Sequence, residues 1–165
     1  MSPAAKPARA GARDSDPEAQ LSSFIAKFEP SNQVLIRAIR KALRKLLPTA
    51  NELVYDNYNF FVIGYSPTER PSDTIVSIAA AANGVGLSFY RGSMVPDPHK
   101  LLLGSGAQNR FIRLPSVDVL SRPEVVALIK AASAGANAPL PTSGRGSLII
   151  RSISAKQRPR RKLKA

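Results

Sequence analysis

The residues best suited to chemistry lie in a short polar and aromatic cluster, Tyr55-Asp56-Asn57-Tyr58-Asn59. The cluster combines a carboxylate, two amides and two phenols, and such groups can line a small-molecule pocket. The same residues can equally form an Asx turn between two tyrosines that pack in the core. The first four residues are therefore candidate ligand-binding residues, and both interpretations stay open.

A second candidate is the loop Gly104-Ser105-Gly106, whose backbone N–H groups could bind an anion. Arg110 and Arg113 follow the loop and would add positive charge, so both are candidate ligand-binding residues. The loop is not a P-loop, because no Gly-Lys-Ser/Thr follows it. Turn geometry alone also explains its glycines.

Catalytic chemistry finds little support in the sequence. The chain has no cysteine and a single histidine, His99, which excludes a cysteine nucleophile, a disulfide framework and a multi-histidine metal site. His99 could act as a general base, but no serine or carboxylate accompanies it in a recognisable motif. Asp97 before Pro98 fits the N-cap of a short helical turn through Leu103. We therefore expect a non-enzymatic protein with no catalytic residue, metal site or cofactor.

Positive charge is the most pronounced feature of the sequence. It has 24 basic and 11 acidic residues, a formal net charge of +13, and residues 139–165 hold eight bases and no acid. A terminal block of like charges usually stays solvated, and its natural partners are polyanions such as nucleic acid or an anionic membrane surface. The block has no interleaved aromatic residues, so we expect binding without base stacking. A merely solubilising terminus is the alternative.

A second group of bases lies on a predicted helix over residues 31–47. Apolar residues mark one face of this helix and bases mark the other, with no acid among them. Such a stripe can bind phosphates or a membrane surface, or it can be a solvated face. The candidate polyanion-binding residues are Arg37, Arg40, Lys41, Arg44 and Lys45 from the helix, and Arg158, Arg160, Arg161, Lys162 and Lys164 from the tail.

The elements that position these residues follow from the spacing of apolar residues and turn signals. Residues 1–16 are predicted to be disordered, and a helix is predicted to begin after the N-cap Asp16, with Pro17 at its first position. Residues 53–58 can form a short strand or an extended loop. Strands are predicted over 59–65, 74–82, 85–91 and 110–114, and a last helix over 123–134. The pattern predicts an α+β fold in which an antiparallel sheet of about five strands packs against N- and C-terminal helices.

This organisation predicts one domain over residues 17–134 and a flexible basic tail over 135–165. Residues 147–154 can form a further strand or part of the tail, and the sequence leaves the choice open. No apolar run is long enough for a membrane helix, so we expect no membrane span and a cytoplasmic protein. The oligomeric state stays open.

The stretch from Asn83 to Leu114 contains several spaced motifs. It reads GVGLSFYRG, then Asp97-Pro98, Leu101-Leu102, a Gly-Ser-Gly turn and RFIRL. Together with the preceding RKLLPTANELVYDNYNFFVIG, this order of motifs resembles the bacterial YdhG-like domain of unknown function. The resemblance covers roughly residues 32–133 and implies a frataxin-like α/β sandwich, with two helices on one face of an antiparallel sheet.

The resemblance also implies an alternative function, because some members of the family are described as intracellular iron chaperones. An iron or small-molecule carrier would use the sheet face near Tyr55. Iron prefers clustered oxygen ligands, however, and the predicted helix over 31–47 has no carboxylate. The sequence therefore favours a binding module whose basic tail contacts polyanions or acidic proteins.

Overall fold

Two helices joined by a short turn open the computed structural model, which describes residues 16–163. The helix α2 spans Pro17–Ile25 and α3 spans Pro30–Leu46. The predicted N-cap is confirmed, since the Asp16 carboxylate accepts the Glu18 backbone N–H at 3.3 Å. Pro30 both ends the turn after α2 and opens α3, because proline suits the first position of a helix.

The remaining elements form a sheet, one long helix and three short 3-10 segments. In chain order they are β1 Asn51–Asp56, β2 Phe61–Ser66, η1 Pro71–Asp73, β3 Val76–Ala81, β4 Gly84–Phe89, η2 Gly92–Met94, β5 Arg110–Arg113, η3 Val117–Ser121, α4 Pro123–Ala134 and β6 Leu148–Ile153. The strands predicted over 59–65, 74–82, 85–91 and 110–114 appear within a few residues of their predicted bounds, and the predicted last helix matches α4. Of the two possibilities for residues 53–58, the structure has the strand, as β1. The α+β class is thus confirmed.

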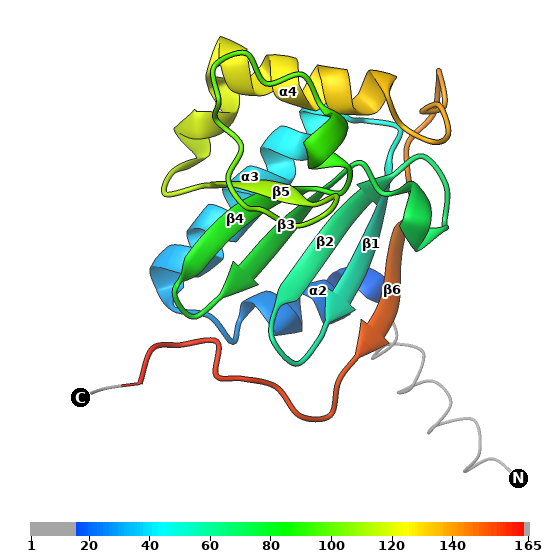
Figure 1. Ribbon diagram of the computed structural model, residues 1–165. Helices are drawn as coiled ribbons and strands as arrows, with labels where there is room; N and C mark the ends of the chain where they lie inside the picture. Colours follow the sequence, from blue (N-terminus) through cyan, green and yellow to red (C-terminus); the bar gives the residue numbers. More distant parts are fainter. Residues whose placement is uncertain (1–15, 164–165) are drawn as a thin grey trace, which may run out of the picture.

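The sheet has six strands in the order β5-β4-β3-β2-β1-β6 (Figure 1). Strands β1 to β5 pair as antiparallel neighbours, whereas β6 lies parallel to β1, with Glu52 opposite Leu148. The expectation of a wholly antiparallel sheet is therefore wrong. The reason is the connection from α4, which returns the chain to the start of β1 before β6 begins, as the hydrogen bond from Glu52 N–H to Ser147 O shows.

The strand β6 also places the end of the domain later than the sequence analysis did. A domain over 17–134 omits β6, and a tail over 135–165 includes it. Gly146 lies so close to Ala50 that a side chain would collide with the backbone there, since an added Cβ would come within 1.7 Å of the Ala50 oxygen. Residues 1–15 and 164–165 lie outside the described part of the chain, and the predicted disorder of residues 1–16 falls largely on them.

The hydrophobic core fills the space between the sheet and the pair α2–α3, which cover one face of it (Figure 1). From α3 the buried side chains are Ile36, Ile39 and Leu43, at the three- and four-residue spacing of one helix face. Phe61 of β2 contacts two aromatic rings of the helical layer, with centroid distances of 6.2 Å to Phe24 and 5.9 Å to Phe28. This packing leaves the opposite face of α3, with its bases, in solvent.

The loop between η2 and β5 differs from the predicted helical turn. Its only regular feature near Asp97 is a tight turn, in which the Lys100 N–H donates to the Asp97 carbonyl. The Asp97 carboxylate instead accepts the backbone N–H groups of Leu101 and Leu102, both at 2.9 Å, so it orders an extended segment. None of the helices within residues 16–163 is long and apolar enough to cross a membrane.

Candidate polyanion-binding site

A basic groove lies along the solvent face of α3. Its volume is about 630 Å³, and five exposed bases line it together with Arg40, Ile25 and Pro48. The five exposed bases are Arg37, Lys41, Arg44, Lys45 and Arg145. Within residues 16–163 none of these five forms an ion pair. We call this feature the α3 groove.

Helical spacing brings the four α3 bases to one stripe. Arg37, Lys41, Arg44 and Lys45 stand at positions i, i+4, i+7 and i+8, which lie on neighbouring turns of the same face. At about 1.5 Å of rise per residue the stripe is about 12 Å long. Repulsion between like charges at this spacing is unfavourable for the isolated helix, so the burial of its apolar face must hold it.

The fifth base, Arg145, comes from the loop before β6, far along the chain. Two hydrogen bonds fix this loop beside the end of α3: Gly146 N–H donates to Pro48 O at 3.4 Å, and Ser147 N–H donates to the Asn51 side-chain oxygen at 2.9 Å. The predicted basic tail over 135–165 includes Arg145, and the sequence shows no link between this residue and α3. No local pattern could have shown one, because the contact depends on the pairing of β6 with β1.

Arg40 was predicted to bind polyanions, but two carboxylates neutralise it. Its guanidinium donates to both oxygens of Glu52, at 2.8 and 2.9 Å, and to both oxygens of Glu18, at 2.9 and 3.0 Å. Burial alone would lower the pKa of Arg40, but the hydrogen bonds to Glu52 and Glu18 raise it above its ordinary value. Arg40 therefore acts as a structural cation that joins α2, α3 and β1.

The Tyr65 hydroxyl completes this network by donating to Glu52 at 2.7 Å. Burial, followed by the Glu52 charge, raises the pKa of Tyr65 well above its ordinary value. The hydrogen bonds from Arg40 lower the pKa of Glu18, whose side chain is exposed. Six bases and two carboxylates thus meet around the α3 groove, which leaves it with a formal charge of +4.

The C-terminal bases also divide into one buried anchor and several exposed side chains. Arg160 is only 4 % exposed and donates to the Asp56 carboxylate at 2.9 Å and to Asn57 O at 2.6 Å. Lys27 approaches the other Asp56 oxygen at 2.6 Å, so a fully buried carboxylate lies between two cations. Arg160 was predicted to contact polyanions; the structure instead places it inside the protein, where it pairs with Asp56.

The other predicted tail residues that the structure describes lie at the surface. Arg158 donates to the Asn59 side chain, Arg161 approaches Glu29 at 4.0 Å, and Lys162 is exposed. Lys164 lies outside the described residues. The described bases of this segment lie beneath the β1–β2 turn (Figure 1), where the Arg158 N–H donates to Tyr58 O.

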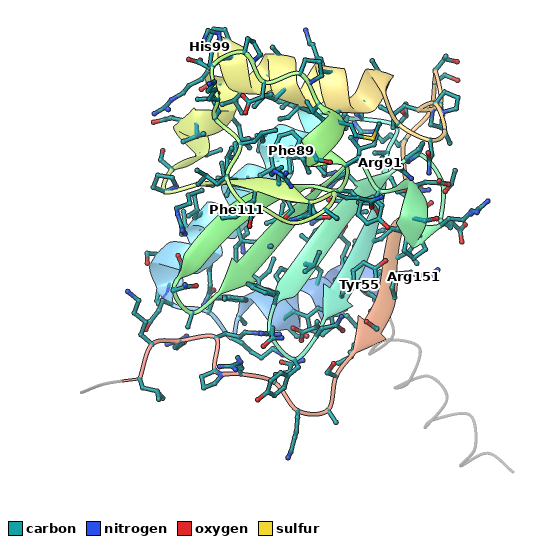
Figure 2. The ribbon with its side chains drawn as sticks, in the orientation of Figure 1. Tyr55, Phe89, Arg91, His99, Phe111 and Arg151 are labelled. Carbon is teal, nitrogen blue, oxygen red and sulfur yellow. The ribbon has the colours of Figure 1, made fainter. Side chains whose placement is uncertain are left out.

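The polar cluster of β1 does not converge on one pocket. Asp56 faces the helices and is neutralised, whereas Tyr55 points to the opposite face of the strand, and Tyr58 lies in the turn. A β-bulge in β6 makes Arg151 the neighbour of Tyr55 (Figure 2). Burial raises the pKa of the Tyr55 phenol, and the Arg151 charge partly opposes this shift.

The glycine loop does not offer its N–H groups together with two free arginines. The Arg110 guanidinium donates to the carbonyl oxygens of Gly106 and Asn109, which ties it to the loop itself. Arg113 lies over the Phe111 ring at 5.6 Å, and His99 sits on the long loop before β5 (Figure 2). Within residues 16–163 no three potential metal ligands of the His, Cys, Asp or Glu type come together.

Comparisons of the sequence with family models and curated proteins, and of the fold with solved structures, found no match. The resemblance to the YdhG-like domain therefore stays a prediction. The geometry defines the class of site more directly, as a cationic groove on a helix supported by one face of a mixed sheet. Its basic side chains are suited to contacting phosphates or other repeated anions.

Proposed function

We propose that this protein is a non-enzymatic binding module that holds polyanions, nucleic acid foremost, in the α3 groove. The observation that carries the proposal is the set of five exposed bases that have no ion-pair partner within residues 16–163 and that two distant segments bring together. Because Glu52 and Glu18 already neutralise Arg40, the groove's remaining charge is available to a ligand. We therefore propose that the protein acts in a compartment that contains nucleic acid, such as the cytoplasm.

The family proposal follows from the sequence motifs quoted above. We infer a YdhG-like domain, and the packing of α2 and α3 on one sheet face supports this inference. An iron carrier remains the alternative that the family resemblance implies. No feature of the structure favours it, since Asp56 is paired with two cations and α3 has no acid.

Salt dependence of binding tests the main proposal. We expect a labelled duplex DNA to bind with a log–log salt slope of roughly −4, since five bases can release about that many counterions. Affinity should then fall on the order of 100-fold between about 50 and about 200 mM salt. Fluorescence anisotropy measures both quantities.

A pair of charge-matched variants locates the site. The triple variant R37Q/K41Q/K45Q removes three groove charges while keeping good helix formers, so it should reduce both affinity and slope. The control K100Q/R122Q/K130Q removes three exposed bases that do not line the groove and should bind almost as the wild type does. Equal losses in both variants would show only a dependence on net charge and would reject the groove as the site.

A further inference from the structure

The β1–β2 turn presents two exposed aromatic side chains at its tip. Tyr58 is 48 % exposed and Phe60 is 49 % exposed, although most large apolar residues of the chain are buried. A hydrogen bond from Asn57 N–H to Phe60 O at 3.0 Å closes the turn that carries both rings. Adjacent exposed rings on a rigid turn are typical of a contact surface.

The C-terminal segment over residues 154–163, here called the arm, lies along this turn. Ser154 N–H donates to Asp56 O, and Arg158 N–H donates to Tyr58 O, both at 2.9 Å. The Arg158 side chain donates to Asn59 at 2.9 Å and places its guanidinium 5.5 Å from the centre of the Tyr58 ring. The sequence separates the basic tail from every aromatic residue, whereas the fold brings them together.

Buried contacts anchor the arm in this position. Arg160 is enclosed between Asp56 and the Phe28 ring, whose centre lies 6.0 Å from the guanidinium. The Gln157 side chain accepts a hydrogen bond from the Lys27 ammonium at 2.7 Å and donates one to Asp56 O at 2.8 Å. The exposed bases of the arm are consequently held close to the two rings, and they are Lys156, Arg158, Arg161 and Lys162.

We propose that the turn and the arm together bind single-stranded nucleic acid, with unpaired bases stacking on Tyr58 and Phe60 and phosphates contacting the arm. This inference rests on the proposed function and specifies its ligand class. Stacking on an aromatic ring requires a base whose face is free, which a duplex does not offer along its length. A guanidinium against an aromatic ring adds a second planar cationic surface for a base.

The arm also contacts the segment that follows α2. Ile25 lines the groove, and the Arg161 side chain donates to the carbonyl of Lys27, two residues further along the chain, at 3.3 Å. We therefore expect a sufficiently long single strand to contact both the arm and the groove. Its bases would meet rings only at the turn, because the groove lining contains no aromatic residue.

Binding of three polyanions to the full chain tests this inference. The probes are an oligothymidylate of about 12 nucleotides, a short duplex DNA, and heparin, which is a polyanion without bases. The variants Tyr58→Leu and Phe60→Leu keep an apolar side chain but remove the ring. We expect each to weaken oligothymidylate binding about tenfold, with an unchanged salt slope and unchanged heparin binding.

Tyr90→Leu is the matched control. Tyr90 is also an exposed tyrosine, 38 % accessible, with a guanidinium at 5.9 Å, but it lies at the end of β4, away from the arm. It should leave oligothymidylate binding unchanged. Photocrosslinking with a thiothymidine-containing strand should label the peptide that contains Tyr58 and Phe60, which mass spectrometry identifies.

The outcomes separate this inference from the proposed function. Binding of duplex and heparin without any effect of the two ring variants on oligothymidylate overturns the inference and leaves the α3 groove in place. If R37Q/K41Q/K45Q still binds oligothymidylate and this binding depends on the two rings, the inference is supported and the α3 groove is rejected as the binding site. A dimer that either ring variant dissociates would instead assign the rings to a contact between copies, and no binding of any probe rejects both proposals.

Discussion

The ion pair between Arg160 and Asp56 should make the C-terminal arm part of the folded domain. Both side chains are almost completely buried, at 2 % and 0 % exposure, and their closest atoms lie 2.9 Å apart. Removing one partner of a buried pair typically costs about 3–5 kcal/mol, because the other charge is left without compensation. Two guanidinium nitrogens of Arg160, Nε and Nη1, already lack partners within the described chain, so little other support remains.

We therefore expect Asp56→Asn and Arg160→Gln each to lower the free energy of unfolding by about 3 kcal/mol. The value lies near the lower end of that range because the arm is close to the end of the described chain and can detach, which returns the guanidinium to water. For a chain of this length the melting temperature should fall by roughly 6–12 °C. Urea unfolding followed by far-UV circular dichroism measures the free energy, since the chain has no tryptophan.

The double variant supplies the decisive comparison. Once one partner of the ion pair has been replaced, replacing the other should lower the free energy of unfolding only slightly further. The coupling energy between the two residues should therefore be about 2–3 kcal/mol. Arg161→Gln is the control: its contact with Glu29 is 4.0 Å long and half-exposed, so the loss should stay within about 0.5 kcal/mol. A coupling energy below about 0.5 kcal/mol would mean that the arm contributes nothing to folding, and the reasoning for a docked arm would fail.

Two further predictions concern β6 and the buried network. Gly146→Ala should lower the free energy of unfolding by about 1–3 kcal/mol or more, because the added Cβ would collide with the Ala50 backbone. Gly106→Ala is the control and should lower it little, because the nearest atom to its Cβ is 3.6 Å away. Equal free energies of unfolding in the two variants would contradict the docking of β6. Tyr65→Phe should lose about 1–3 kcal/mol at neutral pH with its hydrogen bond to Glu52. Because the pKa of Tyr65 is raised in the folded state, the phenol ionises first in the unfolded state, and the free energy of unfolding of the wild type falls above about pH 10. In Tyr65→Phe this decrease should be smaller. Parallel pH profiles of the two proteins would refute the raised pKa.

The elements that local signals define were predictable from the sequence. Asp16 before Pro17 marks the start of α2, and Asn83-Gly84 marks the hairpin between β3 and β4, whose Gly84 has a φ of +138°. These features depend on residues only a few positions apart, so local sequence patterns are sufficient to predict them. The bases of α3 could be placed on its solvent face for the same reason.

The features that the sequence left open depend on contacts between distant segments. Strand β6 pairs in parallel with β1, which lies almost a hundred residues earlier. Parallel strands are not joined by a short turn, so no local turn signal in the sequence predicts this pairing. The position of Arg145 in the groove follows from that pairing. The meeting of Arg158 with Tyr58 follows from the anchor at Arg160, and a count of aromatic residues within the tail cannot reveal it.

The strand β1 determines which bases a ligand can use. Its residues Glu52 and Asp56 stand four apart, so both carboxylates lie on the strand face that packs against the helices. Glu52 binds Arg40 at one end of the strand, and Asp56 binds Arg160 at the other. Each pair holds a neutralised arginine, and other bases lie exposed nearby: those of the α3 groove near Arg40, and those of the arm near Arg160. Two buried acids thus divide the bases of α3 and of the arm into structural cations and two exposed cationic surfaces.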